Sequence, residues 1–165
     1  MQTKWAKAAY CFFFVMLMAA LSSCSRTNEA QAITGKAADF SLTSLEGEQI
    51  VLTELLAQEK VVLAFWASWC GYCRMELPRL ENFSQSNLNR NKVAVLGVNI
   101  KEGPGQIKSF LKKTNLSFPI ILDRNGEVAR LYNVRGVPTL VAIDQDRTIL
   151  YYGHSVEEML KDVNF

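Results

Sequence analysis

Histidine is scarce in this sequence, and runs of basic residues are absent. The 165 residues include one histidine, His154, and four cysteines. A closed zinc site needs four protein ligands, and the chain outside its N-terminal apolar segment offers too few of them. The net charge is +2, and no basic face or charge run stands out. These scarcities argue against a zinc module and against nucleic-acid binding.

Charge is rarest at the N-terminus, where Lys4 and Lys7 are the only charged residues before Arg26. Without these two lysines, the chain has 16 basic and 16 acidic side chains. Residues 8–21 form an apolar run that is shorter than the ~20 residues of a membrane-spanning helix. The positive start and the short run together favour an export signal.

The apolar run ends in Leu-Ser-Ser-Cys at residues 21–24, which resembles the lipobox of bacterial lipoproteins. There the small residues admit the signal peptidase, and the cysteine thiol accepts a diacylglycerol. We therefore expect a signal peptide over residues 1–23, lipidation of Cys24, a flexible tether over 24–37 and a single domain over 38–165. A freely secreted form cut nearby and an uncleaved membrane anchor are the alternatives.

With Cys11 in the leader and Cys24 as a lipid site, Cys70 and Cys73 are the thiols left for the domain. Disulfides persist in the oxidising space that an exported protein enters. The two cysteines lie where a strand-like apolar run at 61–67 ends and a helical pattern at 71–86 begins. A helix N-terminus stabilises a thiolate, which favours Cys70 as the attacking sulfur. Cys73 lies one turn later and is placed to resolve a mixed disulfide.

The spacing alone leaves two other uses of this cysteine pair open. Copper(I) accepts two thiolates, so a copper-binding module without turnover is an alternative. A structural staple is less favoured, because a four-residue loop closes almost no chain entropy. We favour the redox pair.

Strand and helix patterns alternate along the domain, which predicts an α/β fold with a mixed sheet. Hydrophobic residues make up 49% and charged residues 21% of the chain, as in an ordinary globular protein, and no repeat is visible. The expected strands are a β-hairpin over 39–52 that turns at Gly47, then 61–67, 92–100, 118–123, 139–144 and 147–153. The expected helices are 53–58, 71–86 with a kink at Pro78, 103–115, 126–134 and 155–163 with Ser155 as its cap.

The segment FWASWCGYC at 65–73, followed downstream by GVPT at 136–139, resembles the thioredoxin fold over residues 38–163. The leader, the hairpin and the extra helix and strand over 104–122 are similar to the TlpA/ResA-type membrane-tethered thiol–disulfide oxidoreductases. This resemblance implies a thioredoxin-like three-layer sandwich with a mixed central sheet, an N-terminal β-hairpin and an inserted helix and strand. It also implies a cis Val137–Pro138 bond facing the cysteines, with Val137 presenting its backbone to an extended substrate segment.

The same resemblance implies roles for Trp69 and Glu76. Trp69 would flank the reactive sulfur and contact substrate, and a half-buried packing aromatic is the alternative. Glu76 can share a helix face with Cys73 and would tune the thiols or move a proton, and a solvated helix acid is the alternative. Ala64 stands where many cytoplasmic thioredoxins carry a buried aspartate, so Glu76 or water must accept the proton. We expect a surface or capping role for His154.

These observations predict an enzyme, a lipid-anchored thiol–disulfide oxidoreductase in a bacterial cell envelope that faces the periplasmic space. We expect it to reduce protein disulfides, apocytochrome c among the candidate substrates, and to receive electrons from a membrane thiol donor. No cofactor, metal or nucleic acid is expected, and the protein should be a monomer. A disulfide oxidase or isomerase uses the same chemistry and is the main alternative. A peroxidase is less favoured, because its attacking cysteine lies in a different sequence setting.

Overall fold

The computed structural model describes residues 35–87 and 93–165, which are built around a five-stranded sheet. The strand order is β5-β4-β3-β6-β7. The strands are β3 (Lys60–Trp66), β4 (Val93–Ile100), β5 (Ile120–Asp123), β6 (Thr139–Ile143) and β7 (Ile149–Gly153). β3 and β4, and β4 and β5, pair in parallel, whereas β6 runs antiparallel to β3 and β7. The prediction of a mixed sheet is therefore confirmed.

β3 is the central strand, and its sequence KVVLAFW explains why. All its residues after Lys60 are buried, as expected for a strand covered on both faces. Alternate side chains enter two separate cores: Val62, Ala64 and Trp66 enter one, and Val61, Leu63 and Phe65 the other. The strand ends on the segment that carries the cysteines.

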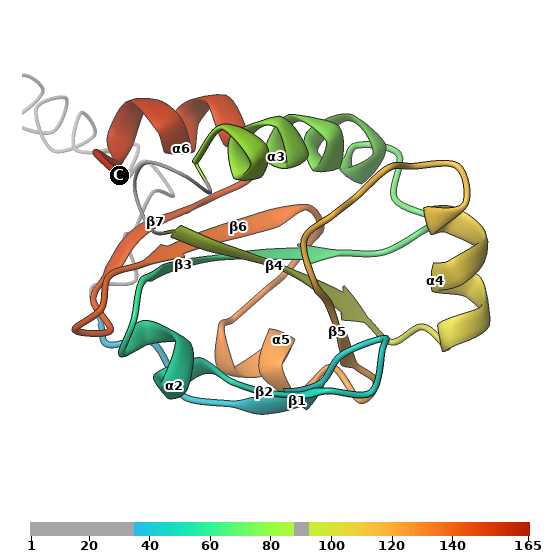
Figure 1. Ribbon diagram of the computed structural model, residues 1–165, viewed down its shortest axis with the longest axis horizontal. Helices are drawn as coiled ribbons and strands as arrows, with labels where there is room; N and C mark the ends of the chain where they lie inside the picture. Colours follow the sequence, from blue (N-terminus) through green and yellow to red (C-terminus); the bar gives the residue numbers. More distant parts are fainter. Residues whose placement is uncertain (1–34, 88–92) are drawn as a thin grey trace, which may run out of the picture. The chain divides into compact units, whose positions relative to one another are not determined.

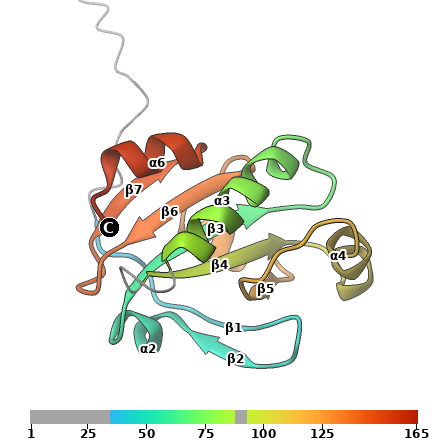
Figure 2. The ribbon, with the colours of Figure 1, turned by 45° about the horizontal axis from the view of Figure 1, so that its top comes forward.

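Helices cover both faces of the sheet and complete the predicted three-layer sandwich (Figure 1). α3 (Cys73–Asn87) and α6 (Val156–Asp162) lie on one face, where α3 crosses the sheet and α6 follows β7 (Figure 2). α2 (Leu52–Leu56) and α5 (Glu127–Leu131) lie on the other face. No helix in this described part of the chain has the length and hydrophobicity of a membrane-spanning segment.

The predicted hairpin and the inserted helix and strand are both present. β1 (Ser41–Thr43) and β2 (Gln49–Val51) pair antiparallel around a turn in which Gly47 has φ 98°, a conformation that favours glycine. α4 (Pro104–Leu111) precedes β5. The helix was expected to end at residue 115 and the strand to begin at residue 118, but α4 ends at Leu111 and β5 begins at Ile120. Pro119 contributes to the later start of β5, because it has no N–H to donate to a strand ladder. Pro78 lies inside α3, as expected.

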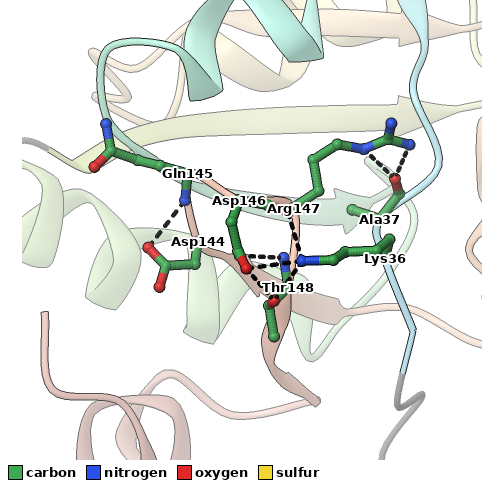
Figure 3. A network of polar contacts seen from close by, with 7 residues as sticks. All are labelled: Lys36, Ala37, Asp144, Gln145, Asp146, Arg147 and Thr148. Carbon is green, nitrogen blue, oxygen red and sulfur yellow. Dashed lines mark hydrogen bonds and ion pairs between the residues drawn. The ribbon is translucent and has the colours of Figure 1, made fainter.

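The N-terminal end of the described chain is joined to the turn between β6 and β7 (Figure 3). The Lys36 ammonium lies 2.7 Å from a carboxylate oxygen of Asp146, and the Ala37 amide donates to the Arg147 carbonyl at 2.8 Å. Because Thr139 pairs with Phe65 and Ile143 with Val61, this turn lies at the end of the sheet opposite the cysteines. The predicted signal peptide, Cys24 and most of the tether lie outside the described residues.

Candidate active site

Cys70 and Cys73 form a disulfide with a Cα–Cα distance of 5.3 Å. Cys70 lies in the loop after β3, and Cys73 is the first residue of α3. Cys70 is 4% exposed and Cys73 is fully buried, so Cys70 is the sulfur nearer to solvent. This asymmetry suits Cys70 as the attacking thiol and Cys73 as the resolving one.

The start of α3 faces the Cys70 sulfur. The helix begins at Cys73 rather than at residue 71, because Gly71 and Tyr72 form a turn ahead of it. The Cys73 amide donates to Cys70 Sγ at 3.1 Å. The first amides of a helix lack intrahelical partners and carry a partial positive charge. In the reduced protein this geometry favours a thiolate at Cys70.

The segment before β6 approaches the disulfide from the other side. The Val137–Pro138 bond is cis, as the family resemblance implies. The Val137 carbonyl oxygen lies 3.3 Å from Cys70 Sγ. Among the described residues, the Val137 amide has no hydrogen-bond acceptor. The backbone of Val137 therefore offers an open donor beside the reactive sulfur.

Large apolar side chains are exposed around the disulfide. Trp69 and Tyr72 are each 72% exposed, and Met75 is 53% exposed. Trp69 is thus not a half-buried packing residue, which removes the alternative considered for it. Exposed apolar patches on soluble proteins mark contact sites for other molecules.

Glu76 is buried and binds two partners through its two carboxylate oxygens. Oε1 lies 2.7 Å from Arg79 Nη1, and Oε2 accepts a 2.7 Å hydrogen bond from the Val156 amide at the start of α6. The alternative of a solvated helix acid is therefore wrong. The carboxylate links α3 to α6, and its effect on the thiols stays a prediction.

Two further sequence-based expectations concern Ala64 and His154. Ala64 is buried in the same core as both cysteines. This part of the core therefore holds a methyl group at the position where the family resemblance places a buried aspartate in many cytoplasmic thioredoxins. His154 Nδ1 lies 2.6 Å from the Pro138 carbonyl. Since a carbonyl only accepts, the imidazole donates and helps to hold the segment that carries Val137. His154 is exposed, in line with a surface role.

Sequence reasoning missed Glu102, which is buried behind the active loop. Its carboxylate accepts hydrogen bonds from the amide and hydroxyl of Ser68, at 2.7 and 2.5 Å, and from the Asn99 side chain at 2.7 Å. The parallel register pairs Trp66 with Asn99, which brings the carboxyl ends of β3 and β4 to one edge of the sheet. The sequence did contain a signal for this site, because Glu102 is an acidic residue that directly follows β4, the second of two buried parallel strands.

Groups of three or more histidine, cysteine or acidic side chains with the spacing of metal ligands do not occur in residues 35–87 and 93–165. A sheet of this topology, with a cysteine pair at the start of α3 and a cis-proline opposite it, defines a thioredoxin-fold protein with a redox-type disulfide.

Comparisons with known proteins agree with that class. Residues 33–152 match the AhpC/TSA family. The chain is 31% identical to the thiol-disulfide oxidoreductase ResA of Bacillus thuringiensis over 82% of its own length and 79% of ResA. It is 37% identical to the thioredoxin-like protein YneN of Bacillus subtilis, over 69% of its length and 66% of YneN. The chain belongs to the AhpC/TSA family and is a ResA-like thiol–disulfide oxidoreductase.

A solved structure gives the same answer for the fold. A secreted disulfide oxidoreductase of Mycobacterium tuberculosis, homologous to Escherichia coli DsbE, superposes with a TM-score of 0.64 at 28% identity. The match covers 73% of this chain and 90% of that one. The thioredoxin-like three-layer fold expected from sequence is thereby confirmed.

Proposed function

We propose that this enzyme is an extracytoplasmic reductase of protein disulfides that is held at a membrane by lipid on Cys24. The observation that carries the proposal is the placement of Cys70, whose sulfur lies 3.1 Å from the Cys73 amide and 3.3 Å from the Val137 carbonyl. The first contact favours a thiolate at Cys70, and the second supports a substrate path along the Val137 backbone. A secreted relative of the same fold supports the extracytoplasmic location.

The reaction begins with the dithiol form. The Cys70 thiolate attacks a substrate disulfide, a bond forms between Cys70 and one substrate sulfur, and the other substrate sulfur leaves as a thiolate and takes up a proton. Cys73 then attacks Cys70 Sγ, which releases the second substrate thiol and restores the Cys70–Cys73 disulfide. Two electrons pass to the substrate, and a membrane thiol donor returns them by the same exchange.

Substrate binding uses the backbone of Val137 and the exposed apolar residues. An extended substrate segment pairs with Val137 in the manner of an added strand, in the position that Pro138 sets. Trp69 and Tyr72 contact apolar parts of the substrate near its cysteine. Backbone pairing carries little sequence information, so an unfolded protein such as an apocytochrome c fits as substrate.

Proton transfer at the resolving cysteine is assigned to Glu76. Ala64 supplies no carboxylate, and Glu76 follows Cys73 by three residues on the same helix. Its ion pair with Arg79 holds this carboxylate in the first turn of α3. A negative charge there holds the Cys73 thiol protonated until the mixed disulfide forms.

The reduction potential of the Cys70–Cys73 pair tests the direction of electron flow. The full chain in a neutral detergent would be equilibrated in dithiothreitol or glutathione buffers, and its thiols counted by alkylation and mass spectrometry. A value at or below about −270 mV, as in thioredoxin, supports a reductase. A value near −120 mV, as in a strong oxidant, overturns it in favour of a disulfide oxidase.

A further inference from the structure

A cavity of about 220 Å³ opens beside the active disulfide and is lined by three cationic side chains. Trp69 and Val137, which flank Cys70, form part of its wall. The cations are Lys101, Arg130 and Arg135. No acidic side chain lines the cavity, and within residues 35–87 and 93–165 none of the three cations is in an ion pair.

Two of these cations are held in place by uncharged partners. The stem of Lys101 lies across Gly126, where an added Cβ would be 2.6 Å from Lys101 Cε, so the absence of a side chain lets the lysine lie flat. Arg130 Nη1 donates to the Asn125 carbonyl at 2.9 Å. Their charges are therefore positioned but not neutralised.

The positive charge is a local feature of this end of the sheet. Residues 35–165 carry equal numbers of basic and acidic side chains, 15 of each. On the other side of the loop, a second hollow of about 630 Å³ is lined by Arg74 and Lys113, again without an acid. Glu102 follows Lys101 directly but turns its carboxylate to Ser68 and Asn99.

We propose that the cationic cavity selects substrates with an acidic residue beside the reactive cysteine, an inference that rests on the proposed reductase function. A segment paired with Val137 places a neighbouring side chain at the mouth of the cavity, whose volume suits one aspartate or glutamate side chain. A carboxylate there accepts charge-assisted hydrogen bonds from Arg130 and Arg135. The Lys36–Asp146 contact lies at the opposite end of the sheet from this cavity.

Three short peptides test this preference. Each contains one cysteine, is supplied as its disulfide-linked dimer, and differs only in having glutamate, glutamine or lysine on both sides of that cysteine. The reduced full chain in neutral detergent is mixed with each dimer, and the rate of peptide thiol release is measured. Dividing each rate by the rate with dithiothreitol, a thiolate reagent without a cationic cavity, corrects for differences in the intrinsic reactivity of the peptides.

The glutamate peptide should be reduced about ten times faster than the glutamine peptide at low salt, and the lysine peptide more slowly than either. The difference should shrink in 1 M salt, where screening acts over about 3 Å. Arg130→Gln and Arg135→Gln should each lower the ratio of glutamate to glutamine rates. Arg124→Gln, an exposed arginine that lines a different hollow, should leave that ratio unchanged.

The outcomes separate this proposal from the function on which it rests. Equal normalised rates for the three peptides would overturn the acidic preference and leave the reductase standing. The proposal would also be overturned if Arg124→Gln lowered the ratio of glutamate to glutamine rates as much as Arg135→Gln does. The preference would then come from the overall charge of the protein and not from the cavity. Failure to reduce any of the peptides would overturn the reductase function and the preference with it.

Discussion

Glu102 Oε2 lies 2.7 Å from the backbone nitrogen of Ser68, two residues before the attacking cysteine. The same carboxylate accepts from the Ser68 hydroxyl and from Asn99 at the end of β4. A residue more than thirty positions downstream therefore holds the loop that carries Cys70. Its partners are uncharged donors, so loss of the carboxylate leaves the partly buried amide and hydroxyl of Ser68 and the buried side chain of Asn99 without their acceptor.

Glu102→Ala should lower the free energy of unfolding by about 2–4 kcal/mol, because buried donors without acceptors keep their desolvation cost. Glu102→Gln should fall between this variant and the wild type, since one amide oxygen still accepts but the amide nitrogen meets other donors. Urea titration of the oxidised protein measures both. Glu54→Ala, on an exposed acid of α2, is the control and should cost less than about 0.5 kcal/mol. Equal losses in the Glu102 and Glu54 variants would contradict this role.

Cys73→Ser should trap a mixed disulfide between Cys70 and a substrate peptide, because the resolving thiol is missing. Mass spectrometry under non-reducing conditions should show protein plus one peptide. Cys70→Ser should trap at least tenfold less, since Cys73 is fully buried and its sulfur is shielded from an incoming disulfide. The reverse order of trapping would exchange the roles of the two cysteines.

Glu76→Gln should move the pH profile of cysteine alkylation in the reduced protein to lower pH, by about one unit or less. Removing a negative charge one helical turn from Cys73 favours the thiolate. Glu81→Gln, on the same helix, is the matched control, because its carboxylate binds Ser117 instead. If only the stability of Glu76→Gln falls and its alkylation profile stays in place, Glu76 acts solely as a link between α3 and α6.

Glu81 should contribute stability that depends on pH. Partial burial raises the pKa of Glu81, but hydrogen bonds from Ser117 and Gln85 outweigh it and hold that pKa below its ordinary value. A carboxyl group with a lowered folded-state pKa stabilises the fold above its unfolded pKa of about 4.3, and this contribution is lost as pH falls through the folded-state pKa.

The difference in unfolding free energy between wild type and Glu81→Gln should therefore be largest near neutral pH and shrink below about pH 4.3. Urea titrations at several pH values between 3 and 7 measure it. In a Ser117→Ala background the pH-dependent part should be smaller, because the hydroxyl that binds Glu81 is gone. A difference that stays constant over this pH range would contradict the linkage.

Local patterns predicted those parts of the fold and site that depend on neighbouring residues. The apolar run of β3 indicated a strand buried on both faces, and Gly47 indicated the hairpin turn. The strand pattern before Cys70 and the helical pattern around Cys73 placed the redox pair at a helix start. Element ends were less accurate, as at the start of β5, because Pro119 has no N–H to donate to the strand ladder although the apolar residues begin before it.

The sequence by itself determined the order of the elements, the cysteine pair and the family, because each depends on short-range spacing of side chains along the chain. Only the tertiary structure decided which distant groups meet. It made Glu76 a buried partner of Val156, brought Glu102 under Ser68, and gathered Lys101, Arg130 and Arg135 around one cavity. These contacts follow from strand register and helix packing, which no local stretch of sequence specifies.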